Sequence, residues 1–205
     1  MLHSYSVDIP RQRVHITIGI VAVAVGLVVE GVASQLLGSP SFGIPLMTTA
    51  TGVFYLFDRH LWKYPPISWL HPIPHIGGTW DGEVESSYCP SDEPSELTPI
   101  DPDGSQLRIT QRWSTIEINY RNPGSSSSRS TSARLEAKST EPRVTYVYEN
   151  EPEGDGLETS QESHSGTAML TLHQIDARRT LRGRYYNDHQ GGQSYGRLRF
   201  EQTND

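Results

Sequence analysis

The chain has 205 residues, a formal net charge of −7 and one cysteine, Cys89. This length leaves room for one domain of about 100 to 150 residues plus an attachment. The acidic balance argues against a nonspecific nucleic-acid binder, which presents a basic surface to the phosphates. A single cysteine can form neither an internal disulfide nor a tetrahedral zinc site, so we expect a reducing compartment and an incidental loop thiol.

Two apolar segments follow a short N-terminal segment, residues 1–13. Residues 14–37 are apolar except for Glu30 and a few small polar side chains, and their length matches the roughly 20 residues that span hydrocarbon. After an expected turn at residues 38–42, residues 43–62 are again largely apolar, with aromatic residues gathered towards the end, where rings favour the membrane–water interface. We therefore expect an N-terminal two-helix transmembrane hairpin.

The placement of basic residues predicts the orientation of this hairpin. Arginines precede the first apolar segment, Arg59 and Lys63 follow the second, and residues 38–45 contain neither lysine nor arginine. Both chain ends are therefore expected in the cytoplasm. Glu30 is costly within a span, so it is expected either to mark a contact between subunits or to lie close enough to the surface to reach water. A cleaved signal peptide and a buried helical hairpin in a soluble protein are the alternatives.

Residues 63–75 form a proline-rich connector. Repeated proline disfavours a helix and predicts a stiff, extended segment that sets the distance between the membrane and the following domain. His71 and His75 are four positions apart, but in an extended segment they do not share the helical face on which this spacing builds a zinc site. We expect no metal and no cofactor.

From residue 76 to residue 205, apolar residues alternate with polar ones, which predicts strands with one buried face. Residues 105–121 predict two strands and a tight hairpin near residues 113–115. About eight antiparallel strands are expected, enough for a small closed barrel that is filled by side chains or holds one small ligand. Trp80 is expected to plug this barrel. The serine-rich residues 125–132 are expected to lead into a strand, whereas the acidic segments 90–105 and 151–163 are expected to be solvated loops.

Several short motifs occur in a fixed order along this part of the chain. They are Ile-Gly-Gly-Thr-Trp-Asp-Gly (76–82), Tyr-Val-Tyr-Glu-Asn (146–150), His-Ser-Gly-Thr-Ala-Met-Leu (164–170), Leu-Arg-Gly-Arg-Tyr-Tyr-Asn (181–187) and Tyr-Gly-Arg-Leu-Arg-Phe (195–200). Together with the apolar segments and the connector, this order resembles the CD-NTase-associated protein fifteen family, the SMODS-associating two-transmembrane, β-strand-rich effectors of CBASS antiphage systems.

The resemblance implies a function without a chemical step. It implies a cytoplasmic β-barrel that binds a cyclic dinucleotide made by a partner CD-NTase and then oligomerises. It also implies membrane segments that disrupt the bacterial inner membrane and cause growth arrest or cell death. No DNA or RNA partner is expected.

The candidate site follows from side-chain chemistry, because tyrosine rings stack on nucleobases and arginine forks match phosphate oxygens. Tyr146 and Tyr148 are expected to stack on a base, Arg121 and Arg143 to bind phosphates, Asn150 and Asn187 to read base edges, and Tyr185 or Tyr186 to provide a second stack. The alternative interpretation places the tyrosines in the barrel core with hydrated hydroxyls and the arginines on its exterior.

Three other functions remain open at this point. The barrel could hold a lipid or another hydrophobic ligand, as lipocalin-like barrels do, or it could serve as a docking scaffold for a protein. An enzyme acting on a lipid or nucleotide is not expected, because no Gly-x-Ser-x-Gly elbow, phosphate loop or His-Glu-x-x-His motif occurs.

Overall fold

The computed structural model describes residues 1–37, 46–87, 97–99, 104–123, 126–152, 163–175, 178–189 and 192–203. The chain divides into two compact units, one made of residues 1–8 and 74–205 and the other of residues 9–73. The expected turn at residues 38–42, Cys89 and most of the two acidic loops lie outside the described residues.

The helical unit contains α1 (Gln12–Leu37) and α2 (Leu46–Arg59), followed by two 3-10 turns, η2 (Leu61–Lys63) and η3 (Ile67–Leu70). Among the described residues, α1 is the one helix that is long and apolar enough to cross a membrane. Its large apolar side chains are exposed on several sides: Ile16, Ile20, Val21, Val23, Val25, Leu27, Val28, Val32 and Leu36. Glu30 is exposed as well.

A transmembrane hairpin is not confirmed. The second expected span, residues 43–62, contains the 14 residues of α2, which make about 21 Å of helix, whereas the hydrocarbon core is about 30 Å thick. The connector also differs from the expected extended segment, because η3 forms between its prolines. Trp62 is fully buried, and the Nε2 atom of His71 lies 3.0 Å from its carbonyl oxygen, so the end of this unit is folded locally.

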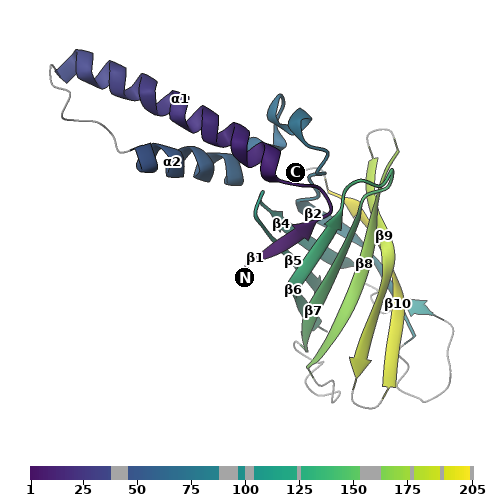
Figure 1. Cartoon of the computed structure of the whole chain (residues 1–205). Coiled ribbons are helices and arrows are strands. Elements are labelled where there is room, and N and C mark those ends of the chain that lie inside the picture. The colour runs from purple at the N-terminus through teal and green to yellow at the C-terminus, as the bar shows by residue number, and fades with distance from the viewer. Residues whose placement is uncertain are drawn as a thin grey trace. The chain divides into compact units, whose positions relative to one another are not determined.

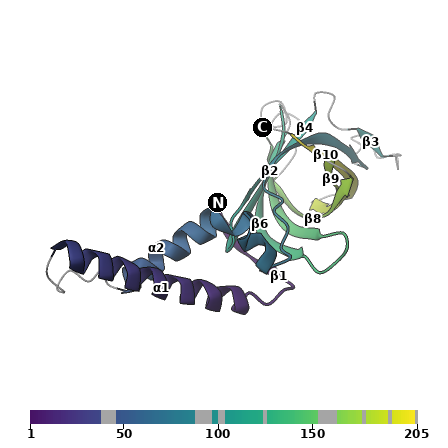
Figure 2. The same ribbon diagram turned by 90° about the horizontal axis from the view of Figure 1, so that it is seen from above.

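The other unit is a closed β-barrel, as expected (Figure 1). Its ring consists of β2 (Gly78–Ser86), β4 (Ser105–Gln111), β5 (Thr115–Asn122), β6 (Ser126–Glu136), β7 (Arg143–Pro152), β8 (His164–Ile175), β9 (Arg178–His189) and β10 (Gly192–Gln202). Each strand pairs antiparallel with its neighbour along the chain, and β10 pairs with β2 to close the ring, which Figure 2 shows from one end. The two-residue strand β3 (Thr98–Pro99) pairs with the end of β2.

The alternation in the sequence separates the inner face of the barrel from the outer face. Along β4, for example, every second side chain from Ser105 to Gln111 is buried and those between are exposed. Trp80 is fully buried and its indole N–H donates to the carbonyl oxygen of Ile76 at 3.1 Å, which confirms it as a plug at one end. The serine-rich segment forms β6, and the hairpin between β4 and β5 turns at residues 112–114.

A further strand, β1 (His3–Val7), was not predicted from the sequence. It lies between β5 and β6, antiparallel to β5 and parallel to β6. β5 and β6 pair directly only over residues 119–122 and 126–129, so β1 fills the seam where these two strands separate. Tyr5 is buried there, and its hydroxyl donates to the carbonyl oxygen of Arg112 at 3.2 Å.

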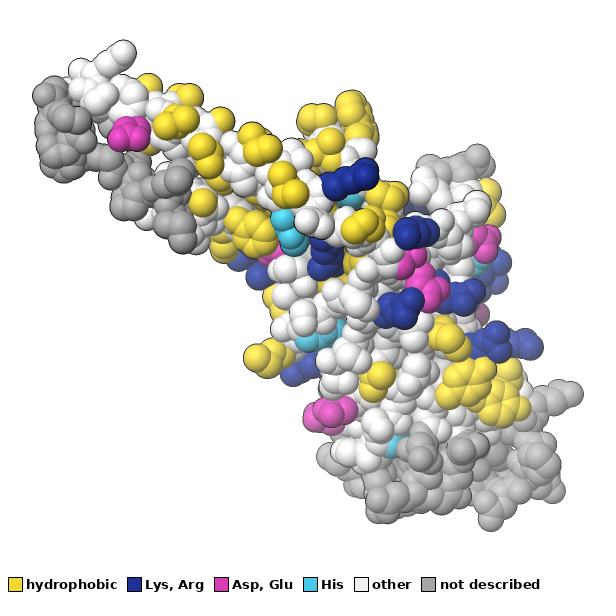
Figure 3. Space-filling model, in the orientation of Figure 1, with side chains coloured by type: hydrophobic (Ala, Val, Ile, Leu, Met, Phe, Trp, Pro, Cys, Tyr) yellow, Lys and Arg dark blue, Asp and Glu magenta, His cyan; other side chains and the backbone are white. Residues whose placement is uncertain are grey.

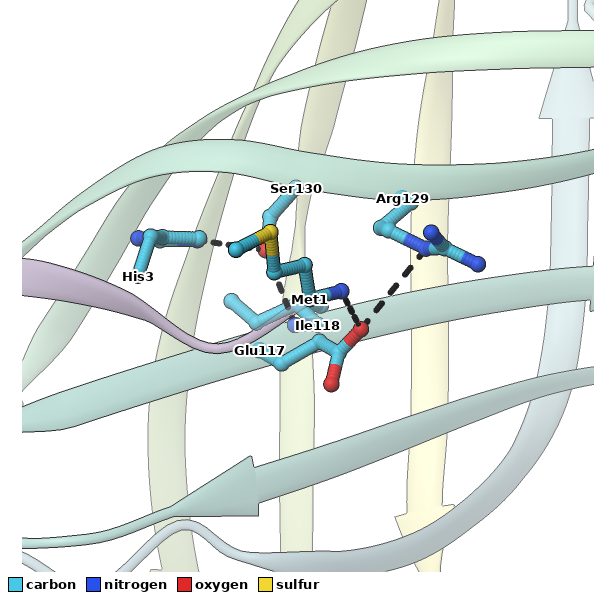
Figure 4. A network of polar contacts seen from close by, with 6 residues as sticks. All are labelled: Met1, His3, Glu117, Ile118, Arg129 and Ser130. Atoms are coloured by element: carbon cyan, nitrogen blue, oxygen red, sulfur yellow. Dashed lines mark hydrogen bonds and ion pairs between the residues drawn. The ribbon is translucent and has the colours of Figure 1, made fainter.

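Ser130 on β6 lies next to the point where β5 and β6 stop pairing directly. Its hydroxyl oxygen accepts the backbone N–H of Ile118 on β5 at 2.9 Å and lies 2.8 Å from Nε2 of His3 on β1. Beside it, Glu117 on β5 contacts Arg129 on β6 at 3.6 Å. Figure 4 shows this network, which also includes the amino group of Met1. One hydroxyl on β6 therefore ties β1 and β5 together.

The barrel is expected to lose stability when Tyr5 is truncated. Because buried aromatic side chains cost about 3–5 kcal/mol when replaced by alanine, Tyr5→Ala should lower the free energy of unfolding by about 3 kcal/mol. Tyr5→Phe should cost about 1–2 kcal/mol, because the hydroxyl donates to Arg112 and also accepts from Nε2 of Gln111. Urea unfolding of the full chain in detergent, followed by near-ultraviolet circular dichroism, measures both. Ser4→Ala and Ser6→Ala, at exposed positions of the same strand, are the controls, and a Tyr5→Ala chain as stable as these would contradict the placement of β1.

Candidate ligand-binding site in the barrel

The interior of the barrel is apolar towards one end and polar towards the other. Inward-facing side chains in the apolar part include Trp80, Leu107, Ile109, Ile118, Leu135, Leu170, Leu181 and Phe200. In the polar part, the inward-facing positions carry hydroxyls and amides: Ser86, Ser105, Tyr120, Asn122, Ser128, Tyr148, Asn150, Tyr185, Asn187 and Ser194. Polar side chains at the Trp80 end, namely Gln111, Arg179 and Gln202, are already hydrogen-bonded within the protein, so a ligand that forms several hydrogen bonds finds more partners at the polar end.

Four tyrosines from three strands form a cluster where the two parts meet. This tyrosine cluster consists of Tyr120 on β5, Tyr146 and Tyr148 on β7, and Tyr185 on β9. The side chains of Tyr146 and Tyr148 are only 4% and 8% exposed, and their ring centroids lie 6.1 Å apart at an interplanar angle of 52°. The cluster thus offers aromatic surface and hydroxyls inside the barrel.

The four hydroxyls of the tyrosine cluster differ in their hydrogen bonds. The Tyr185 hydroxyl donates to Oγ of Ser86 at 2.7 Å, and the Tyr120 hydroxyl lies 2.8 Å from Oγ of Ser105. The Tyr146 and Tyr148 hydroxyls have no hydrogen-bond partner among the residues that the structure describes. Neither oxygen is among the fully buried side-chain atoms that lack a partner, so both remain accessible, and these two phenols keep donors and acceptors that a ligand can use.

Burial also keeps these phenols neutral. It raises the pKa of Tyr146 well above the ordinary value of 10.0, and the Tyr120 phenol nearby adds to this effect. For Tyr148, burial and then the phenols of Tyr146, Tyr185 and Tyr120 raise the pKa in the same direction. A phenol of ordinary pKa is already neutral at pH 7, and the raised pKa keeps both groups as uncharged hydrogen-bond donors in alkaline solution as well.

Two inward-facing glycines make room for the rings of the tyrosine cluster. A Cβ atom at Gly166 on β8 would collide with the Tyr148 phenol, and one at Gly196 on β10 would collide with the ring of Tyr185. Any other residue at Gly166 would displace the Tyr148 ring, and any other residue at Gly196 would collide with both the Tyr185 ring and the backbone of β2 at Glu85. The glycines lie in two of the motifs singled out from the sequence, but their role depends on strand register and was not predicted.

The structure brings together five of the eight expected site residues, namely Tyr146, Tyr148, Asn150, Tyr185 and Asn187, which all face inward at or next to the polar end. It places the other three, Arg121, Arg143 and Tyr186, on the outer face of the barrel. Among the described positions of the polar part, no arginine, lysine or carboxylate faces inward.

Other residues of the polar part were missed in the sequence analysis. Ser128 and Ser194 are buried beside the expected residues, and the Ser194 hydroxyl donates to Oδ1 of Asn187. His164 shares the inward parity of Gly166 and pairs in register with Asn150. Serine is common in loops and on strand exteriors, so only the register shows that these side chains face the tyrosine cluster. Within the described ranges, no group of three or more histidine, cysteine or acidic side chains could hold a metal ion.

One comparison with known proteins gives a match. A family model described as Cap15, cyclic dinucleotide receptor domain, matches residues 71–202, which is more than half of the chain and includes all eight ring strands. Residues 1–8, which contribute β1, lie outside the matched range. No curated protein and no solved structure matches the chain.

The raised pKa values predict how stability depends on pH. Because Tyr146 and Tyr148 hold their protons more tightly in the folded barrel, the unfolded chain releases them first, and the free energy of unfolding should fall as the pH rises above about 10. The double substitution Tyr146→Phe/Tyr148→Phe should flatten this alkaline decline. Urea unfolding between about pH 9 and pH 11 measures it, with the exposed Tyr64→Phe as the control. An unchanged slope in the double variant would show that neither phenol is shielded.

Proposed function

The chain belongs to the Cap15 family of cyclic dinucleotide receptor domains, and from this premise we propose that it is a membrane-attached effector of CBASS antiphage defence. In this proposal, the polar part of the barrel binds the cyclic dinucleotide made by a partner CD-NTase. Binding leads to oligomerisation, and the helical unit then disrupts the bacterial inner membrane. No catalytic step is part of the proposal.

The proposed binding site rests mainly on the unused hydrogen-bonding capacity of Tyr146 and Tyr148 inside the barrel. Cyclic dinucleotides present two flat bases and two phosphodiesters. Phenol rings provide contact surface for bases, and neutral O–H and N–H groups donate to phosphate oxygens and to base edges. Asn150 and Asn187 face the same space and supply amide groups for the base edges.

Neutral donors replace the arginines that we first assigned to the phosphates. Arg121 and Arg143 are exposed on the outer face, so they cannot approach a ligand held by the tyrosine cluster without a change in the barrel wall. The proposal therefore assigns the phosphates to hydroxyl groups of the polar part. A hydrophobic ligand fits less well, because Trp80, Leu107 and Phe200 already fill the apolar part and are fully buried.

The proposed membrane attachment rests on α1. A helix with exposed apolar side chains on several sides is unfavourable in water and favourable in lipid. The position of β1 adds a topological condition. Residues 1–8 and 74–205 form one unit, so both lie on the same side of a membrane, and the chain between them must cross an even number of times or not at all. If α1 crosses, residues 38–73 must return.

The barrel is attached to both ends of the helical unit, which suggests how ligand binding is transmitted. At the first connection, the carboxylate of Asp8 accepts the backbone N–H groups of Ala137 at 2.8 Å and Lys138 at 3.2 Å. At the second, Gln111 accepts the N–H of Ile76 at 2.7 Å and donates to the carbonyl oxygen of Pro74 at 3.2 Å. A shift of β4 or β6 on ligand binding would therefore move one connection directly.

Binding is tested with the full chain in detergent, because a fragment that starts at the matched domain lacks β1. Isothermal titration against 2′,3′- and 3′,3′-linked cyclic dinucleotides is expected to find one tight ligand. Tyr148→Phe should weaken its binding about tenfold or more, since a hydrogen bond to a charged group contributes about 1.5–3 kcal/mol. The exposed Tyr64→Phe loses the same atom and should bind normally.

The same samples test the later steps. Sizing should show a larger assembly only with the ligand that binds, and the full chain in liposomes should release trapped dye only with that ligand. Tyr148→Phe should shift the ligand concentration required for both effects. A folded chain that binds no member of the panel would refute the proposed messenger, and binding without dye release would refute the proposed membrane disruption.

The topology is tested by labelling single cysteines in a Cys89→Ser chain with a membrane-impermeant thiol reagent. Ser4→Cys in β1 and Ser165→Cys on the outside of β8 are expected to react only after the inner membrane is opened. Gln35→Cys near the end of α1 should react from the outside of intact spheroplasts. Labelling of Ser4→Cys and Ser165→Cys from opposite sides of the membrane would show that β1 and β8 do not belong to one folded unit. If Gln35→Cys, like the other two, reacts only after the membrane is opened, α1 does not cross.

A further inference from the structure

The outer face of β9 and β10 carries an unusual arrangement of side chains. Three successive outward-facing pairs lie directly opposite each other across these strands: Arg182 with Arg199, Arg184 with Arg197, and Tyr186 with Tyr195. Like charges directly opposite each other destabilise an antiparallel pair. Two such pairs side by side, in a chain whose net charge is −7, concentrate positive charge at one place on an otherwise acidic protein.

Nearby carboxylates compensate this charge only weakly. Arg197 lies 3.9 Å from Glu85 and Arg199 lies 3.8 Å from Glu201, and all four side chains are well exposed, so each pair contributes little. Arg182 has no ion pair with any residue that the structure describes. The positive charge of these arginines is therefore largely uncompensated within the protein and is available to an external anion.

A groove runs along this face and combines the charge with aromatic surface. It encloses about 670 Å³, and Thr171, Arg182, Arg184, Tyr186, Tyr195 and Arg197 line it. The two tyrosines are 44% and 52% exposed, and Nη1 of Arg184 donates to the Tyr186 hydroxyl at 3.2 Å. Glu141 and His173 also line the groove, and Nδ1 of His173 lies 3.1 Å from Oε1 of Glu141. Figure 3 shows basic and hydrophobic side chains side by side over these strands.

We propose that this outer groove is a second ligand site, separate from the tyrosine cluster, that binds a nucleotide phosphodiester. Arg184 and Arg197 bind the phosphate, because two guanidinium groups facing each other across adjacent strands can hold one anion between them. Tyr186 and Tyr195 stack on a base, because their exposed rings lie next to this pair on the same face. Arg182 also lines the groove and adds to its positive charge, and Arg199 lies opposite Arg182 on β10.

The two sites lie on opposite faces of one wall of the barrel. Tyr185 points inward to the tyrosine cluster, and the next residue, Tyr186, points outward into the groove. The proposal therefore does not depend on a ligand inside the barrel. The nucleotide in the groove could be a second molecule of a cyclic dinucleotide or a linear nucleotide, which share the phosphodiester and the base, and the experiment separates these two sources.

The test uses the full chain in detergent with the substitution Tyr186→Trp, which places an indole in the groove. Its fluorescence, taken as the difference from the unsubstituted chain, should be quenched in a saturable manner when a base stacks on it. The probes are cyclic dinucleotides, linear 5′-phosphorylated dinucleotides with the same bases, and inorganic phosphate. Quenching by the cyclic probes alone identifies the ligand of the groove as a second bound molecule of a cyclic dinucleotide. Quenching by the linear probes as well identifies a general nucleotide site. Both results support the proposal.

Adding Arg184→Gln/Arg197→Gln to the reporter chain should raise the Kd from quenching about tenfold or more, because two charge-assisted contacts are lost. The control pair Arg108→Gln/Arg134→Gln removes two exposed arginines from other strands and should change the Kd less than about twofold. Tyr148→Phe should leave the quenching unchanged, so a failure of the inner site can be told apart from a failure of the groove.

Three outcomes would overturn the proposal. The first is no saturable quenching by any nucleotide probe. The second is inorganic phosphate that competes with the nucleotides at equal affinity, which would make the groove a general anion site. The third is an equal loss of affinity in the control pair, or loss of quenching in the Tyr148→Phe chain, which would place the ligand elsewhere.

Discussion

Closure of the sheet is the constraint on which the rest of this structure depends. A closed antiparallel barrel leaves no exposed strand edge, and here the ring is completed in two ways: β10 pairs with β2, and β1 fills the seam between β5 and β6. The second closure uses a segment that precedes α1. The folded barrel therefore holds the chain on both sides of the helical unit, and the barrel cannot be complete unless the N-terminal strand returns to it.

This arrangement limits how the protein can be attached to a membrane. An isolated α1 that crossed once would leave β1 and the other strands on opposite sides, and the seam would stay open. The described α2 is too short to cross at full thickness, so the return of the chain involves more than this helix if α1 crosses. The positive residues before α1 and after α2 favour the same outcome, because they place both connections on one side. Fold closure and charge distribution thus independently support the proposed topology, in which both connections lie on one side of the membrane.

The sequence was sufficient to predict the barrel, because alternation with a period of two specifies which side chains are inside. The same alternation also predicts on which face of the barrel Arg121 and Arg143 lie. Ile118 and Tyr120 share a face, so Arg121 must lie on the other one, and Val144 and Tyr146 exclude Arg143 from the interior in the same way. The guanidinium chemistry of Arg121 and Arg143 suits a phosphate, but strand parity places both side chains on the outer face.

Other features could not be read from the sequence. β1 has five residues and follows no long pattern, and its place depends on a seam between two strands more than a hundred residues away. The roles of Gly166 and Gly196 depend on which tyrosine lies opposite them, which is set by register across the ring. The facing arginines of the outer groove are likewise a property of the β9–β10 register, since Arg184 and Arg197 are thirteen positions apart.

Both proposed sites hold polar groups in an arrangement that reduces the stability of the empty barrel. Inside, the Tyr146 and Tyr148 phenols have no protein hydrogen-bond partner among the described residues, and two glycines, which weaken a strand, make room for the tyrosine rings. Outside, arginines face arginines. A fold selected for stability alone would pair or remove these groups, whereas a receptor retains them, because a ligand that satisfies them binds the folded state and stabilises it in proportion to its concentration and affinity. Ser105 on β4 and Ser128 on β6 line the polar part, and the ends of these two strands adjoin the connections to the helical unit, so the free energy gained on binding inside the barrel can act on these connections.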